Sequence, residues 1–161
     1  MGEAARDITA LGGVPVLGLI VVIAVLFLTM SHNRSTALLL ACSVGSGAVI
    51  STLLKLVFDR HRPDIPGVAR VFSASFPSGH AALSAIVYLV LAVILADLSR
   101  DARMRRLVVA VALFLSFLIG VTRVYLGVHY PSDVVAGWSL GGAWAILSIV
   151  SLGLLRAKRG S

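Results

Sequence analysis

Residues 14–30 read VPVLGLIVVIAVLFLTM, a run without a single charged side chain. A helix rises about 1.5 Å per residue, so this run nearly crosses the ~30 Å hydrocarbon core of a bilayer. No basic flank precedes the run and no convincing small-residue cleavage site follows it, which argues against a secretory signal peptide. We therefore interpret residues 14–30 as a membrane span.

Four further apolar runs follow, at residues 36–54, 81–96, 107–121 and 134–155. Of the 161 residues, 58% are hydrophobic and 13% are charged, a balance outside the range of soluble domains. The sequence therefore predicts an all-α fold: an integral membrane helical bundle of about five transmembrane helices, in a single domain covering residues 1–161. The runs 81–96 and 107–121 are slightly short, which tilting or snorkelling ends would accommodate.

Cysteine content and charge exclude several classes of site. Cys42 is the only cysteine and lies within an apolar run, so neither a disulfide framework nor a cysteine metal cluster is expected. The net charge is +7, but the cations lie in short loops beside apolar runs and are not interleaved with aromatic residues. We expect membrane lipids rather than nucleic acid as the partners of these cations.

Three short polar clusters interrupt the apolar runs. They are Lys55 with Arg62-Pro63, then Pro77-Ser78-Gly79-His80, and finally Arg123 with His129 and Asp133. Ionisable groups are costly beside a bilayer and persist mainly where they act. Threading five spans through a membrane places all three clusters on the same side.

The charges of the loops predict which side this is. The side without the clusters carries a net +6, from Arg34, Arg100, Arg103, Arg105, Arg106, Arg156, Lys158 and Arg159 against Asp97 and Asp101. The side with the clusters carries a net +1, from Arg6, Lys55, Arg60, Arg62, Arg70 and Arg123 against Glu3, Asp7, Asp59, Asp64 and Asp133. Cytoplasmic loops collect Lys and Arg, so the C-terminus is predicted to be cytoplasmic and the clusters to face outward. In a bacterium this means the inner (plasma) membrane, with the clusters in the periplasm.

The residue types in these clusters suit the transfer of a phosphoryl group. Its transition state spreads charge over three oxygens, which fixed cations such as Lys55, Arg62 and Arg123 would stabilise in place of a metal ion. Ser78 precedes an apolar helical run and is a candidate N-cap, and the N–H groups of such a helix start bind phosphate oxygens.

Two histidines complete this set. His80, at the same helix start, is placed to donate a proton to a departing alcohol. His129 and Asp133 are four positions apart, with Pro131 suited to the first helical turn between them. At this spacing a carboxylate can hold one imidazole nitrogen and leave the other free to attack phosphorus.

The clusters also carry a family pattern. Residues 55–63 match KxxxxxxRP, residues 77–80 match PSGH, and residues 122–133 nearly match SRxxxxxHxxxD. With three ordered motifs, the chain resembles the type 2 phosphatidic acid phosphatase superfamily. The resemblance implies that His129 is the nucleophile of a phosphohistidine mechanism, that Asp133 orients it and that His80 is the general acid. It implies no metal and no other cofactor, and it implies that the phosphate is bound by Lys55, Arg62, Ser78, Gly79 and Arg123.

The chain departs from the family pattern in two ways. Thr122 stands where the family usually has serine, which preserves a hydroxyl that is able to bond on the phosphate side. Family members commonly have six spans, and we expect this chain to begin at the amphipathic stretch before the second. One wall of the lipid entrance would then be missing, and a homo-oligomer would restore it. Arg60 and His61 occupy unspecified positions of the first motif, and we favour no contact with substrate for either.

The favoured hypothesis is an enzyme that hydrolyses a lipid phosphate monoester or diphosphate at the outer membrane face. Undecaprenyl diphosphate, phosphatidylglycerophosphate, phosphatidic acid and a lipid A phosphate are all compatible substrates. One alternative is a lipid-to-lipid phosphotransferase that uses the same phosphohistidine. A second alternative, from another class, is a non-catalytic membrane module that binds lipid headgroups. The related vanadate-dependent haloperoxidases share the motifs, but they are soluble, and the apolar runs argue against that activity.

Overall fold

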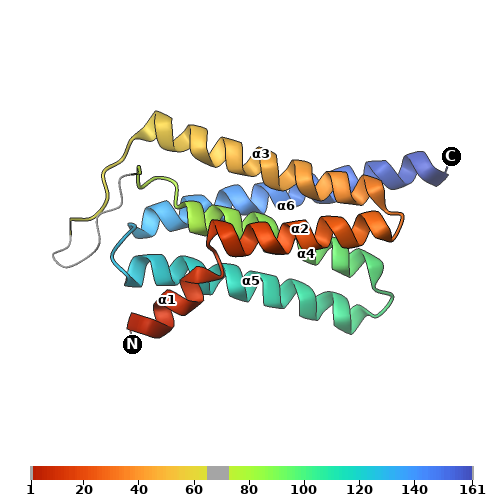
Figure 1. The fold of residues 1–161 in the computed structure, drawn as a ribbon, viewed down its shortest axis with the longest axis horizontal. Coiled ribbons are helices and arrows are strands. Elements are labelled where there is room, and N and C mark those ends of the chain that lie inside the picture. Colours follow the sequence, from red (N-terminus) through yellow and green to blue (C-terminus); the bar gives the residue numbers. More distant parts are fainter. Residues whose placement is uncertain (1, 65–72, 161) are drawn as a thin grey trace.

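The computed structural model describes residues 2–64 and 73–160, and the described residues form helices and no strand (Figure 1). The helices are α1 (Gly2–Ala10), α2 (Val14–Met30), α3 (Arg34–Phe58), α4 (Gly79–Leu98), α5 (Ala102–Tyr125) and α6 (Pro131–Gly160). Arg70, which entered the charge comparison above, lies outside the described residues, as do the side chains of Arg156, Lys158 and Arg159. The predicted all-α class is confirmed.

Five helical segments in the described part of the chain are long and apolar enough to cross a membrane. The helix at Val14–Met30 has the predicted bounds, and the other four extend beyond their apolar runs. The expectation that two runs are short was wrong: α4 has 20 residues and α5 has 24. Helix α4 begins with Gly79-His80 and α5 begins with a segment that contains Arg103, Arg105 and Arg106, which hydropathy alone does not count as part of a span.

Helix α4 lies at the centre of the bundle and contacts α2, α3, α5 and α6. Its side chains Ile86 and Val90 are fully buried, in a core that also includes Leu40 of α3. Many outward side chains are apolar, among them Phe27 and Phe114, which are 61% and 60% exposed. An apolar exterior of this extent suits a protein surrounded by lipid.

The two ends of the bundle differ in what they carry. In Figure 1, the α2–α3 turn, the α4–α5 turn and the C-terminus lie at one end. Helix α1, the loop after α3 and the α5–α6 turn lie at the other end, so all three polar clusters share it, as the threading of five spans predicts.

Gly137 lets α6 approach the start of α4. A Cβ at Gly137 would lie 2.9 Å from the backbone nitrogen of Ala82 and 2.9 Å from the carbonyl oxygen of Ser78. These are backbone atoms, so an added methyl group can be accommodated only if the two helices move apart.

We therefore expect Gly137→Ala to destabilise the protein by about 1–3 kcal/mol, the usual cost of overpacking. The measurement is the thermal melting temperature of the purified protein in detergent. Gly142→Ala is the matched control on the same helix, because a Cβ there meets no atom within 4 Å. Equal melting temperatures for the two variants would contradict a close α4–α6 contact.

Candidate active site

His129 and Asp133 meet where α6 begins. The helix starts at Pro131, whose fixed φ suits a first turn, and this places Asp133 within that turn. Both residues are buried, with 3% of His129 and 0% of Asp133 exposed. Asp133 Oδ2 lies 3.4 Å from His129 Nδ1 and accepts the backbone N–H of Tyr130 at 2.9 Å. The carboxylate and the imidazole therefore lie together, in the arrangement expected from their spacing.

The other ring nitrogen, His129 Nε2, lies 3.1 Å from Arg62 Nη1. A guanidinium can only donate hydrogen bonds, so Nε2 presents its lone pair and the ring proton lies on Nδ1, facing Asp133. Burial is the main cause that lowers the pKa of His129 from 6.5 to about 3, and it is reinforced by three cations, Arg62, Arg123 and Lys55. The hydrogen bond with Asp133 acts in the opposite direction. At neutral pH the imidazole is uncharged, which is the form a nucleophile needs.

Two backbone carbonyl groups, from different segments of the chain, hold the Arg62 side chain in place. Its Nε donates to the Ser73 carbonyl and its Nη1 to the Val128 carbonyl, both at 2.8 Å. Burial lowers the pKa of Arg62 and the charge of Asp133 opposes this, yet an arginine remains protonated in a protein. Arg62 is therefore a fixed cation beside the imidazole, with a planar fork suited to phosphate oxygens.

Lys55, in the last turn of α3, reaches the start of α4. Its Nζ donates to the carbonyls of Ala74 and Pro77 at 2.9 and 2.8 Å. A Cβ at Gly79, the first residue of α4, would lie 3.6 Å from Lys55 Cε. The ammonium group thus lies close to the first-turn N–H groups of α4, and both favour an anion.

Ser78 occupies the N-cap position of α4, as predicted, but its side chain makes no capping hydrogen bond. Its backbone N–H instead donates to the Asp133 carbonyl at 2.9 Å, which joins the PSGH segment to α6. Within residues 2–64 and 73–160, the buried side-chain polar atoms that have no partner are Ser78 Oγ and Arg123 Nε. Buried polar atoms are normally paired, so this set suits a bound phosphoryl group.

Arg123, in the last turn of α5, is held by the N-terminal helix. Its Nη1 donates to Thr9 Oγ1 at 3.1 Å, although the two residues are 114 positions apart. His80 lies at the same end, where a Cβ on Gly12 would be 3.5 Å from its Cδ2. The charges of Arg123, Arg62 and Lys55 act on His80 as well. The structure thus brings together all eight of the predicted site residues at one end of the bundle.

Three further side chains contact Arg123 or Asp133 and were not expected from the sequence. Thr9 binds Arg123, while Arg60 Nη1 donates to Asp133 Oδ1 at 2.8 Å and the Ser75 hydroxyl donates to Oδ2. Arg60 occupies an unspecified position of the first motif and Ser75 lies two positions before the second, which is a weak signal, and nothing in the sequence points to Thr9.

Thr122 and His61 lie next to site residues in the sequence, but neither contacts the candidate site through its side chain. The Thr122 hydroxyl donates to the Ile119 carbonyl of its own helix at 2.7 Å, so it serves α5 rather than a phosphate-side bond. His61 is exposed and has no hydrogen-bond partner among the described residues.

The arrangement combines a neutral imidazole, a buried carboxylate, a second histidine, three cations and a helix start. Within the described ranges, no group of three or more His, Cys, Asp or Glu side chains is placed to hold a metal ion. Fixed cations and backbone N–H groups can stabilise the charge of a phosphoryl transition state. Such a set can hold the negative charge of a phosphoryl group beside His129 Nε2.

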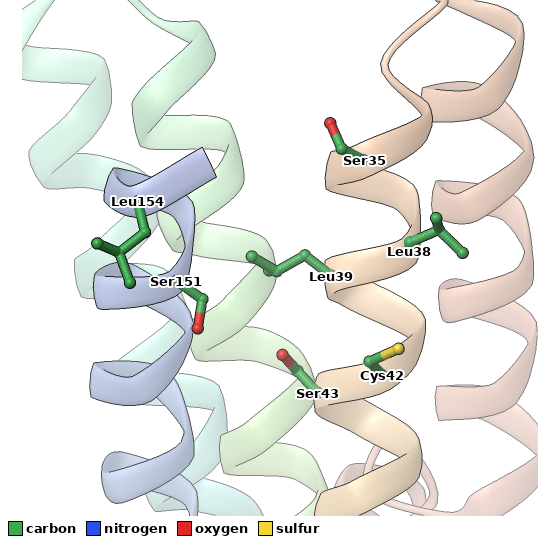
Figure 2. Close-up of a pocket in the computed structure, with 7 residues that line it drawn as sticks. All are labelled: Ser35, Leu38, Leu39, Cys42, Ser43, Ser151 and Leu154. Atoms are coloured by element: carbon green, nitrogen blue, oxygen red, sulfur yellow. The ribbon is translucent and has the colours of Figure 1, made fainter. Parts of the chain in front are cut away.

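Two cavities lie away from these residues. One, of about 420 Å³, lies between the first turns of α3 and the end of α6, at the end opposite the polar clusters. Figure 2 shows Leu39 and Ser43 projecting from α3 towards α6, and Leu38 and Cys42 on the other side of α3. A second, wholly apolar groove of about 380 Å³ lies between α2 and α4. Neither contains a residue of the candidate site.

Comparison with known sequences identifies related proteins. A family model described as the PAP2 superfamily matches residues 36–156. Phosphatidylglycerophosphatase B of Bacillus subtilis (strain 168) is 34% identical over 142 residues, covering 88% of this chain and 70% of that protein. A lipid A 1-phosphatase of Rhizobium etli is 33% identical over 112 residues, covering 63% of this chain and 44% of that protein.

Two solved structures share the fold. The transmembrane PAP2-type phosphatidylglycerolphosphate phosphatase from Bacillus subtilis superposes with a TM-score of 0.85 at 33% identity, covering 91% of this chain and 74% of that chain. The LpxE of Aquifex aeolicus superposes with a TM-score of 0.70 at 25% identity, covering 92% of this chain and 84% of that chain.

Proposed function

The chain belongs to the PAP2 superfamily as an integral membrane phosphatase, and from this premise we propose that it hydrolyses a lipid phosphate monoester or diphosphate through a phosphohistidine at His129. The observation that carries the proposal is the state of the His129 ring: Nδ1 faces Asp133, while Nε2 presents its lone pair beside Arg62. A phosphoryl group bound by Arg62 would therefore lie next to the attacking nitrogen.

The proposed reaction has two steps. In the first, His129 Nε2 bonds to phosphorus, the bond from phosphorus to the leaving oxygen breaks, and His80 donates its proton to that oxygen. In the second, water attacks the phosphohistidine, His80 takes a proton from the water, and inorganic phosphate leaves with His129 restored. Asp133 stabilises the ring when it carries positive charge. The leaving group is a lipid alcohol, or a lipid monophosphate where the substrate is a diphosphate.

We propose that the phosphate is held by cations and backbone N–H groups. Lys55, Arg62 and Arg123 supply the charge, while the Ser78 hydroxyl and the first-turn N–H groups from Gly79 onward supply neutral donors. The unpaired Ser78 Oγ and Arg123 Nε support this assignment, because a phosphate oxygen would satisfy both. Charge supplied in this way takes the place of a metal ion.

The proposed test is a panel of lipid phosphates offered to the purified protein in detergent, each assayed with and without EDTA. It contains diphosphate and monophosphate prenyl lipids, phosphatidylglycerophosphate, phosphatidic acid and a lipid A phosphate. We expect inorganic phosphate to be released from at least one of them at a rate that EDTA does not change. Transfer of labelled phosphate to a second lipid would instead indicate a phosphotransferase. Absence of turnover on every substrate would favour the non-catalytic lipid-binding module and overturn the proposal.

We further propose that the site faces the outside of the cell, the periplasm in a bacterium, from the inner membrane. The loops at the opposite end carry the larger excess of Lys and Arg, which favours the cytoplasm for that end. A second arm of the panel offers a short-chain, membrane-impermeant lipid phosphate to intact spheroplasts. Hydrolysis without permeabilisation is expected, whereas activity that requires lysis would place the site on the cytoplasmic side.

A further inference from the structure

The carboxylate of Asp133 is fully buried and receives donors from three directions. Its Oδ1 accepts from Arg60 Nη1 at 2.8 Å. Its Oδ2 accepts the backbone N–H of Tyr130 at 2.9 Å and the hydroxyl of Ser75, and it also faces His129 Nδ1. A carboxylate has about four lone-pair directions, so these partners occupy nearly all of them. Among the described residues, Arg60 is the only residue that donates a hydrogen bond to Asp133 Oδ1.

Arg60 is itself held in a fixed geometry. Its Nη1 also donates to Ser132 Oγ at 2.8 Å, and its guanidinium lies over the Tyr130 ring, 4.3 Å from the ring centroid. Its carbonyl accepts the backbone N–H of Ser75 at 2.7 Å. Arg60 therefore acts on Asp133 twice: directly at Oδ1, and at Oδ2 by fixing the segment that carries the Ser75 hydroxyl.

We propose that Arg60 is a positioning residue of this active site, which locks the Asp133 carboxylate and through it the His129 ring without contacting the substrate. The inference rests on the proposed function, because it assigns Arg60 a part in the same reaction. Arg60 carries the same charge as the phosphate-binding cations and lies two positions before Arg62. Unlike those cations, it is assigned to the Asp133 carboxylate and not to the phosphate.

Burial explains why this contact matters. A buried carboxylate that loses a charged partner is strongly destabilised, and it relieves the cost by rotating. Rotation would withdraw the acceptor that faces His129 Nδ1, and the ring would lose its orientation and tautomer. Lysine cannot replace arginine fully here, because it lacks the planar fork that stacks on Tyr130 while bonding two oxygens.

The experiment compares Arg60→Met and Arg60→Lys with wild type on a substrate found active in the panel. We expect kcat to fall about tenfold to a hundredfold for Arg60→Met, the usual range when an outer partner that holds a functional side chain is lost. KM should be unchanged, and Arg60→Lys should recover part of kcat. Ser75→Ala, which removes a donor from Oδ2, should lower kcat in the same way. His61→Gln is the matched control, since it changes an exposed neighbour on the same loop and should behave as wild type.

A pH profile gives a readout that a purely structural role would not move. Removing the charge of Arg60 leaves Asp133 less neutralised, which favours the protonated form of His129. The acid limb of kcat/KM should therefore move to higher pH in Arg60→Met. The other charged groups that act on His129 are unchanged by the substitution: Lys55 on α3, Arg62 on the loop and Arg123 on α5.

The possible outcomes distinguish a failure of the positioning role of Arg60 from a failure of the proposed phosphatase function. A wild-type protein without phosphatase activity would overturn the proposed function. An active wild type with unchanged kcat in both Arg60 variants would overturn the positioning role alone. A rise in KM at constant kcat, largest for diphosphate headgroups, would show that Arg60 binds the substrate instead. Should Arg60→Met fail to fold, as judged by its melting in detergent, Arg60→Lys and Ser75→Ala still decide the question.

Discussion

His129→Ala is expected to abolish turnover, with a loss of about 10⁴-fold or more, because the substitution removes the proposed nucleophile itself. The buried carboxylate and the three cations would remain, so the variant should still bind a lipid phosphate. The measurement is phosphate release by the purified protein, together with the trapping of labelled phosphate on the protein after a rapid acid-free quench. Phosphohistidine is labile to acid and stable to base, which distinguishes it from a phosphoserine.

The control for this variant is His61→Ala, which removes an exposed imidazole from the same end of the molecule. It should retain both the turnover and the trapped label of wild type. A label that forms at the wild-type rate in His129→Ala would exclude His129 as the nucleophile. Equal thermal melting of the two variants would show that the loss does not come from unfolding.

His80→Ala is expected to lower the hydrolysis of a lipid alcohol ester by about 10²–10⁴-fold, the usual contribution of a general acid. A lipid alkoxide is a poor leaving group and needs the proton, whereas a nitrophenolate is stable without it. With an aryl phosphate, the first step should therefore be nearly normal in the variant. The second step, which needs a base to activate water, should remain slow.

The measurement for His80→Ala is a stopped-flow burst. The variant should release one equivalent of nitrophenol quickly and then accumulate the phosphorylated protein, while wild type shows steady turnover. A first step, measured as the burst, that is slowed as much on the aryl ester as on the lipid ester would contradict the assignment of His80 as the general acid.

Much of the fold was predictable because a bilayer imposes a simple rule on the sequence. The uncharged run 14–30 became a helix with the same bounds, and five spans fixed which loops share an end. Helix ends were less predictable. Helices α4 and α5 continue through Gly79-His80 and through residues 102–106, where hydropathy falls although the backbone bonding continues.

The candidate site was predictable as far as its residues lie within ordered motifs. The Arg60–Asp133 and Thr9–Arg123 contacts join residues 73 and 114 positions apart, and no local spacing predicts which distant loop supplies a partner. The Ser78 side chain shows a related limit. Its type and position favour a capping hydroxyl, but the structure buries that hydroxyl without a partner while the backbone N–H bonds Asp133.

The Ser78–Asp133 backbone bond joins the starts of two helices that run in the same direction. It links the N-cap of α4 to the first turn of α6, and both helices run from the polar end of the bundle towards the other end. Their macrodipoles are therefore aligned, and two partial positive poles add to the field of the side-chain cations. An attraction for lipid headgroups is thus built into the main chain, and no single side-chain replacement can remove it.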